Sequence, residues 1–254
     1  MALSLSLIRS ISVMFLMILV GAALIKTKVV GDEAVEVLTK VHIYVSSPAS
    51  LFNAFLIELN RQTLMGLGLA MAASLVSHAL IIGMTRLLRK PLKLTTMERG
   101  SIIYSNAGNL VIPLVQMTLG PEMVIYTSGY LFVSTILVWT HGKTLLSGKK
   151  PDNYFKIFTS VNMLAIFAGL ICFLLNVRLP SVLDGTLDAL SATLAPTAML
   201  SVGMILAKED LRKVLLNGRA LMVNFFRLVV CPLLMLAVIL ACGITRARPW
   251  TAPI

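Results

Sequence analysis

Long apolar segments separated by short polar connections make up nearly the whole chain. Charged residues and turn residues divide it into eight apolar segments, at about residues 5–25, 37–57, 62–87, 99–119, 122–142, 156–177, 187–207 and 218–243. A helix needs about 20 residues to cross the hydrocarbon core of a bilayer, so each segment is long enough to span it. The pattern predicts an all-α polytopic membrane protein without a separate soluble domain.

Composition agrees with this prediction and excludes other classes of protein. Hydrophobic residues make up 57% of the chain, charged residues only 13%, and the mean hydropathy is +0.90. The formal charge of +11 lies in the connections and not in a stripe with aromatic residues, so the expected partner is a lipid bilayer and not nucleic acid. The sequence holds no metal-binding or catalytic motif, so we expect no metal site, no cofactor and no enzyme activity.

The basic residues are divided unevenly between the two sides of the predicted bundle. Sixteen Lys and Arg fall in the odd-numbered connections and five fall on the opposite side. By the positive-inside rule the odd-numbered connections are cytoplasmic. We therefore expect a multi-pass protein of the plasma or inner membrane with its N-terminus outside.

The chain resembles itself at an offset of 148 residues. Gly21 aligns with Gly169 and Pro48 with Pro196, and the glycine-to-proline spacing is 27 residues in both copies. A repeat with an odd number of spans enters the membrane in opposite senses, as in many secondary transporters. We expect inverted repeats, with a complete five-helix copy at residues 1–150 and an incomplete copy of about three helices at residues 151–254.

The fourth apolar segment contains the strongest candidate site, at Ser105-Asn106-Ala107-Gly108-Asn109-Leu110-Val111-Ile112-Pro113. Asn106 and Asn109 offer amide donors, Gly108 allows close backbone approach, and Pro113 lacks the N–H that would continue a helix. In lipid, an unwound segment persists only where it is packed in protein or lines a cavity. The pattern indicates a broken helix whose ends bind an anion. The alternative is a proline kink with asparagines that pair between helices.

Weaker candidates lie in four other segments. Pro48 with Asn53, and Pro196, mark milder breaks at equivalent repeat positions, where a simple kink is the alternative to a substrate contact. His78 could relay protons, although a packed polar contact fits it better. Arg227 is the only charge inside an apolar segment, where a coupling role and a side chain reaching toward the cytoplasm are equally good explanations.

Two stretches resemble the auxin efflux carrier family, in the branch of the bacterial malate and malonate transporters. The first runs from Ser105 to Pro113, continues with Leu119-Gly120-Pro121-Glu122 and includes Tyr130 and Trp139-Thr140-His141-Gly142; the second runs from Ala195 to Leu206. The resemblance implies ten helices in two inverted five-helix repeats with crossing broken helices, a bundle similar to sodium/proton antiporters or bile-acid symporters. About eight of these ten helices are expected in this chain. The implied substrates are small organic anions.

We therefore expect a secondary active permease that moves a small organic anion by alternating access. The alternative is a truncated, non-transporting membrane remnant or an interacting membrane subunit, because the symmetry partner of the broken segment would begin near residue 247. A channel fits less well, since inverted repeats with broken helices suit alternating access. The sequence leaves proton or sodium coupling and homo-oligomerisation open.

Overall fold

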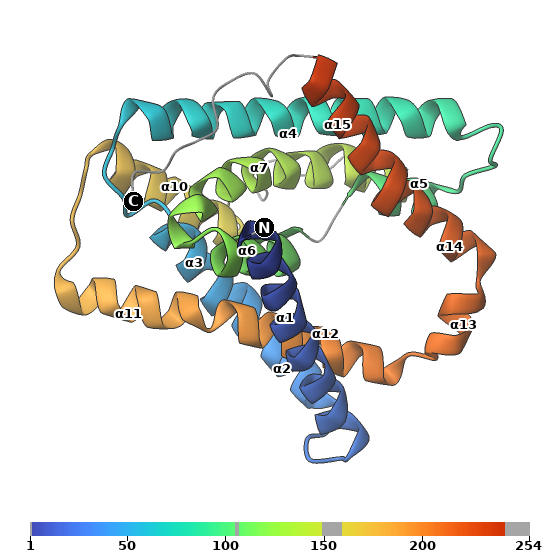
Figure 1. Ribbon diagram of the computed structural model, residues 1–254, viewed down its shortest axis with the longest axis horizontal. Helices are drawn as coiled ribbons and strands as arrows, with labels where there is room; N and C mark the ends of the chain where they lie inside the picture. Colours follow the sequence, from blue (N-terminus) through green and yellow to red (C-terminus); the bar gives the residue numbers. More distant parts are fainter. Residues whose placement is uncertain (1, 105–106, 149–158, 242–254) are drawn as a thin grey trace. The chain divides into compact units, whose positions relative to one another are not determined.

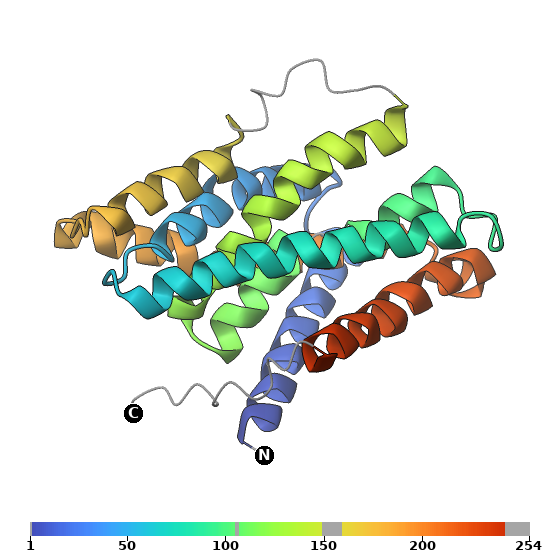
Figure 2. The ribbon, with the colours of Figure 1, turned by 90° about the horizontal axis from the view of Figure 1, so that it is seen from above.

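The computed structural model describes residues 2–104, 107–148 and 159–241. All of the regular elements in this part of the chain are helices (Figures 1 and 2). In the first half these are α1 (Ala2–Lys26), α2 (Glu33–Val41), η1 (His42–Ser46), α3 (Ser47–Asn53), α4 (Arg61–Leu88), α5 (Thr96–Ile103), α6 (Ala107–Thr118), η2 (Pro121–Met123), α7 (Val124–Leu137), η3 (Val138–Gly142) and α8 (Lys143–Ser147). In the second half they are α10 (Val161–Leu174), α11 (Ser181–Ala192), α12 (Leu194–Lys208), α13 (Leu211–Leu216), α14 (Gly218–Phe225), η4 (Phe226–Val230) and α15 (Cys231–Ala241).

The predicted class, an all-α polytopic membrane protein, is confirmed. Five helical stretches in the described residues are long and apolar enough to cross a membrane: Leu7–Lys26, Arg61–Leu88, Pro121–Ser147, Ser181–Lys208 and Gly218–Val238. The predicted sixth span corresponds to the shorter apolar helix α10. The second span is the continuous run of α2, η1 and α3, while the fourth is divided between α5 and α6.

The chain forms two compact units that differ from the two predicted repeats. The first unit contains residues 1–75 and 106–210, and the second contains residues 76–105 and 211–254. Each unit therefore draws on both halves of the sequence. The division into repeats at residue 150 stays a prediction.

The main hydrophobic core of the first unit surrounds α3. Leu51 and Phe55 are 1% exposed and pack with residues of α7 and α10, including Ile125 and Met163. Helix α10 lies beside α3 (Figure 2), and the rings of Phe55 and Phe173 meet edge to face at 6.4 Å between centroids. A Cβ added to Gly169 would lie 2.8 Å from a ring carbon of Phe55, so glycine permits this close packing.

A second close helix pair in the same unit is the crossing of α1 and α12 (Figure 1). A Cβ on Gly21 would overlap the backbone carbonyl of Leu200, and a Cβ on Gly203 would overlap that of Ile18. Small residues allow such close backbone approach between membrane helices. Gly21 and Gly169 are related by the predicted offset of 148 residues, as are Phe55 and Gly203, so the predicted repeat would make the two close pairs equivalent.

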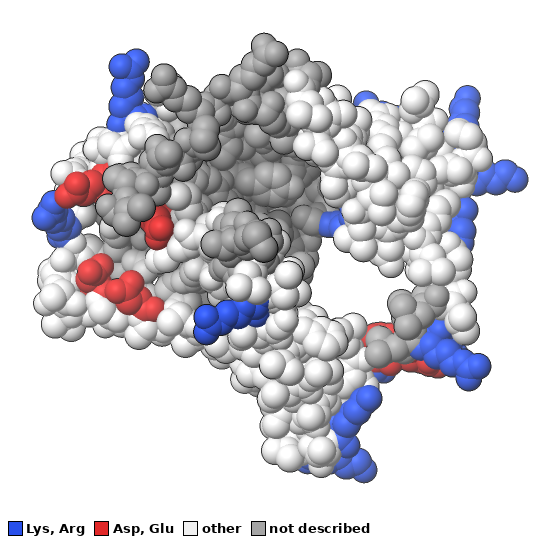
Figure 3. Space-filling view, in the orientation of Figure 1, with Lys and Arg blue, Asp and Glu red and all other residues white. Residues whose placement is uncertain are grey.

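Ion pairs join the connections of the first unit in two separate groups. Lys208 pairs with Asp32 at 2.8 Å, which links the first connection to the seventh. Arg178 pairs with Glu58 at 2.8 Å, which links the second connection to the sixth. On the face drawn in Figure 3, acidic side chains gather near the turn between α10 and α11. Each pair thus joins two odd-numbered connections or two even-numbered connections. This agrees with a chain that crosses the membrane back and forth, because connections of the same parity then lie on the same side.

The second unit has its own core, formed where the last span packs on α5 and the end of α4. Leu94, Ile102, Val223 and Cys231 are buried there. Partly buried side chains from the same helices, among them Phe226, complete the cluster. This packing holds α14 and η4 against α5.

Candidate functional site

The fourth span is interrupted, as predicted, and its first half is the short helix α5. The helix begins with a capping box, in which the Thr95 side chain accepts from the Glu98 backbone N–H and the Glu98 carboxylate accepts from the Thr95 backbone N–H. It ends at Ile103, because Tyr104 adopts an extended backbone with φ −104° and ψ 128°. A helix end in the interior of an apolar segment leaves backbone carbonyls that need partners.

Arg227 supplies a donor to two of these carbonyls. Its Nη1 donates a hydrogen bond to the Ser101 carbonyl and another, at 2.7 Å, to the Tyr104 carbonyl. Arg227 belongs to η4, a π-helical turn in the last span. The only charge predicted inside an apolar segment therefore lies at the end of α5, where the partial negative charge of a helix C-terminus attracts a cation.

The second half of the span, α6, starts at Ala107, so Gly108 and Asn109 belong to its first turn. Ser105 and Asn106 lie outside the described residues, as do the side chains of residues 107–110. The expectation that Pro113 interrupts the helix is wrong, because this buried residue lies within α6. Backbone conformation changes earlier, at Tyr104, and the interruption precedes the proline.

The two other prolines also lie within nearly continuous helices. Pro48 is buried in the first turn of α3, directly after the π-helical turn η1, while Pro196 is exposed in the first turn of α12, one turn after Thr193. The Ser46 and Thr193 hydroxyls meet at 2.7 Å, and His42 Nδ1 lies 3.5 Å from the Thr197 hydroxyl. The perturbed turns of spans two and seven thus contact each other at positions 147 residues apart.

A cavity of about 240 Å³ lies in the first unit at the ends of the even-numbered connections. Its polar lining comes from Ser50, Asn53, Gln116, Glu122, Asp184, Asp188 and Ser191. Asn53 Nδ2 donates to Asp188 Oδ1 at 2.8 Å, and Gln116 Nε2 donates to the Ser191 hydroxyl at 3.3 Å. These bonds join span two to span seven and α6 to span seven. With three carboxylic acids in its wall, the cavity is an acidic pocket.

His78 is a core residue of the second unit, only 2% exposed. Its ring lies 6.1 Å from the ring of Tyr104, between centroids, at an interplanar angle of 33°. This packing agrees with the polar core contact considered for His78, and its role in proton relay stays a prediction. The same Tyr104 offers its carbonyl to Arg227.

Comparison with known protein families identifies the kind of protein that carries this interrupted span. The sequence model of a family described as membrane transport protein matches residues 6–157 and 152–250. The chain belongs to the membrane transport protein family. This confirms the resemblance to auxin efflux carriers, and it makes the chain a multi-pass membrane transporter that works in a lipid bilayer. A comparison with curated proteins finds no match.

Several polar residues of this transporter were not predicted. Gln116, Ser191 and Asp184 line the acidic pocket, and Arg219 binds Glu98 at the start of α5. A signal for Gln116 was available, because it is the one amide after Pro113 in an otherwise apolar stretch. Within the described residues, no group of three or more His, Cys, Asp or Glu side chains is arranged to hold a metal ion.

Proposed function

We propose that this membrane transport protein is a secondary active permease for a small organic anion and that it works by alternating access. The protein lies in the plasma or inner membrane with its N-terminus outside, because the odd-numbered connections carry most of the basic residues. Membership of the family supports a role in membrane transport. The substrate class and the mechanism are inferred from the interruption of the fourth span and from electrostatics.

The observation that carries the proposal is the capped end of α5. An arginine bonded to two carbonyls inside a spanning segment makes the interruption a built feature of the fold. Beyond the interruption, the first N–H groups of α6 lack intrahelical partners and carry partial positive charge. A helix N-terminus of this kind is how broken-helix transporters receive an anionic group.

Electrostatics favours the interruption over the acidic pocket as the place for an anion. At about 6 Å and an effective dielectric constant of about 20, each like-charged pair costs about 3 kcal/mol. Glu122, Asp184 and Asp188 would each add to this cost for a carboxylate in the pocket. The anion therefore binds at the interruption, near Asn106, Gly108, Asn109 and Pro113.

The remaining candidates take supporting roles in the proposal. Pro48 and Pro196 shape the contact between spans two and seven, and Asn53 joins those spans through Asp188. His78 stays a candidate for proton coupling because it is buried beside Tyr104, at the end of α5. Arg227 does not carry protons, because a guanidinium stays charged at any physiological pH.

The test is uptake of radiolabelled mono- and dicarboxylates into proteoliposomes, with and without a pH gradient. We expect Asn106→Ala to abolish uptake of the transported anion while membrane insertion is unchanged. Asn224→Ala, an equal change at an exposed position of α14, is the control and retains uptake. Unchanged uptake by Asn106→Ala would remove the site assignment, and a wild-type protein that moves none of these anions would contradict the function.

A further inference from the structure

Arg227 makes an unusual contact for a membrane arginine, because a single nitrogen serves two backbone carbonyls. Nη1 donates to both the Ser101 and the Tyr104 carbonyl. The Nε and Nη2 donors make no hydrogen bond within the described part of the chain. Within the described residues, the hydrogen bonds of this side chain are thus all with the end of α5.

These contacts provide partners for two of the carbonyls at the α5 terminus. The Tyr104 backbone N–H donates to the Gly100 carbonyl at 2.9 Å and closes the last turn. The Ser101 and Tyr104 carbonyls lie at the end of the helix, where a carbonyl in an apolar segment needs a donor from another part of the protein. Arg227 provides the donors, together with a positive charge at the negative end of the helix.

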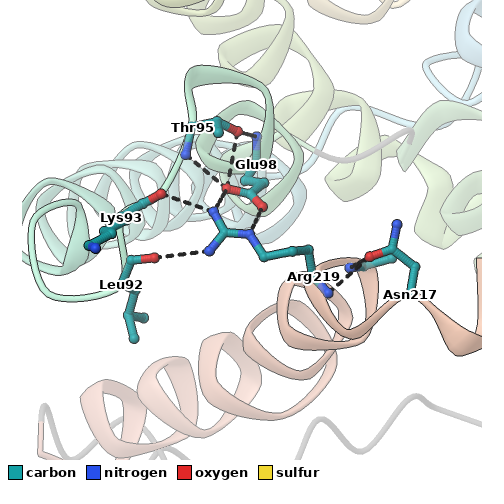
Figure 4. A network of polar contacts seen from close by, with 7 residues as sticks. Leu92, Lys93, Thr95, Glu98, Asn217 and Arg219 are labelled. Atoms are coloured by element: carbon teal, nitrogen blue, oxygen red, sulfur yellow. Dashed lines mark hydrogen bonds and ion pairs between the residues drawn. The ribbon is translucent and has the colours of Figure 1, made fainter.

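A second arginine from the same span holds the other end of α5. Arg219 binds both carboxylate oxygens of Glu98 at 2.7 Å and donates to the Leu92 and Lys93 carbonyls at 3.2 and 2.9 Å (Figure 4). Arg219 lies about two helical turns before Arg227, roughly 12 Å along the helix at 1.5 Å per residue. This spacing matches the length of the eight-residue α5. Two arginines of the last span therefore bind α5, Arg219 at its start and Arg227 at its end.

We propose that Arg227 is a positioning residue that terminates α5 inside the membrane and thereby fixes the residue at which the fourth span leaves the helix. Its effect on transport rests on the proposed function, whereas its effect on α5 does not. The matched residue Arg219 fixes the loop end of α5, away from the interruption.

The geometry also separates this role from direct substrate binding. An arginine that binds a carboxylate uses two nitrogens as a planar fork, which lysine cannot reproduce. Here one nitrogen contacts both carbonyls, and a lysine ammonium with three N–H donors can do the same. Positioning therefore predicts rescue by Arg227→Lys, and substrate binding predicts its failure.

The first experiment measures hydrogen–deuterium exchange of the purified protein, checked for monodispersity by size exclusion. We expect Arg227→Met to accelerate exchange at least tenfold at the amides of Ile103 and Tyr104 and to leave residues 96–99 unchanged. Arg219→Met shows the reverse pattern, with faster exchange at the start of α5 only. Unchanged exchange at Ile103 and Tyr104 in Arg227→Met would overturn the proposal, whatever the transport result.

The second experiment measures initial uptake rates for an anion that the wild-type protein transports. Arg227→Met lowers the maximal rate at least tenfold, whereas Arg219→Met stays within threefold of wild type. Arg227→Lys restores at least half of the maximal rate and leaves KM within twofold. A KM raised tenfold or more in Arg227→Lys would make Arg227 a substrate ligand and overturn the positioning role.

The two experiments fail in different ways. Fast exchange in Arg227→Met combined with a wild-type uptake rate would overturn the positioning role in transport. If the wild-type protein transports none of the tested anions, the proposed function fails. The exchange comparison still decides in that case whether Arg227 terminates α5.

Discussion

The turns of spans two and seven differ from the interruption of span four, although all three spans contain a proline. In spans two and seven the helix continues past Pro48 and Pro196. Span two contains only the π-helical turn η1 before Pro48, and in span seven a single residue, Thr193, separates α11 from α12. In span four the chain leaves the helix at Tyr104, well before Pro113, which lies inside α6.

The difference indicates that the hydrogen-bond partners of the backbone carbonyls, and not the proline, decide whether these membrane helices are interrupted. A proline removes one N–H donor, and a small local adjustment such as the π-helical turn η1 before Pro48 can accommodate it. A full interruption leaves several carbonyls exposed and needs a stronger donor, which Arg227 provides. Four predictions test this contrast.

The largest effect is expected at the crossing of α1 and α12, next to the spans that stay continuous. In Gly203→Ala the new Cβ overlaps the Ile18 carbonyl, so the helices must separate, at a cost of about 3 kcal/mol. Gly68→Ala in α4 is the matched control, because its Cβ enters open space and should stabilise the helix by about 0.5–1 kcal/mol. Thermal unfolding followed by size exclusion should show opposite shifts, and equal shifts would contradict the close crossing.

A smaller effect of opposite sign is expected at Pro113. Because this residue lies inside α6, Pro113→Ala restores one helical hydrogen bond and should stabilise the protein by about 1–2 kcal/mol. Hydrogen–deuterium exchange at Ile103 and Tyr104 should stay within threefold of wild type, because the helix ends there without help from Pro113. If exchange at these two amides slows more than tenfold, the proline itself maintains the interruption and the contrast drawn above is wrong.

The contact between the two continuous spans should contribute about 1 kcal/mol. Ser46→Ala leaves the Thr193 hydroxyl without its 2.7 Å partner in span two. Thr193→Val in the Ser46→Ala background should then add less destabilisation than it does alone. A double-mutant cycle of thermal stability measures this coupling, and additive effects would show that the hydroxyl pair does not hold the spans together.

The smallest effect is expected from pH at the loop end of α5. Hydrogen bonding from the Thr95 backbone N–H, helped by Arg219, holds the pKa of the Glu98 carboxyl below its ordinary value of 4.5, although burial opposes this shift. The stabilisation is therefore present above the ordinary pKa and is lost as the pH falls through the lower, folded value. Protection of the amides at the start of α5, corrected for the intrinsic exchange rate at each pH, should decrease only as the pH falls below 4.5. Glu98→Gln should remove that dependence.

The apolar pattern was enough to predict the spans and the place of the interruption. Apolar length marks a membrane helix, and asparagine and glycine inside such a segment mark a break. The pattern failed at Pro113, because sequence spacing does not show where carbonyls find donors. Arg227 stood out as a charge inside an apolar segment, but its partners, the Ser101 and Tyr104 carbonyls, come from a segment more than 120 residues away.

The acidic pocket was missed for a related reason. Asp184, Asp188 and Glu122 lie at span ends in the sequence, where charged residues are ordinary. Only the approach of the second, fourth and sixth connections brings them around one cavity with Asn53. Local sequence can assign each residue to a side of the membrane, but it does not measure the distance between connections.

The ion pairs that join the connections of the first unit bear on the kinetics of the proposed cycle. The side chains of Arg178 and Glu58 are 81% and 80% exposed, while Lys208 and its partner Asp32 are 35% and 80% exposed. Exposed pairs of this kind contribute about 1 kcal/mol or less and weaken as ionic strength rises. Separating either of these two pairs therefore adds little to an activation barrier.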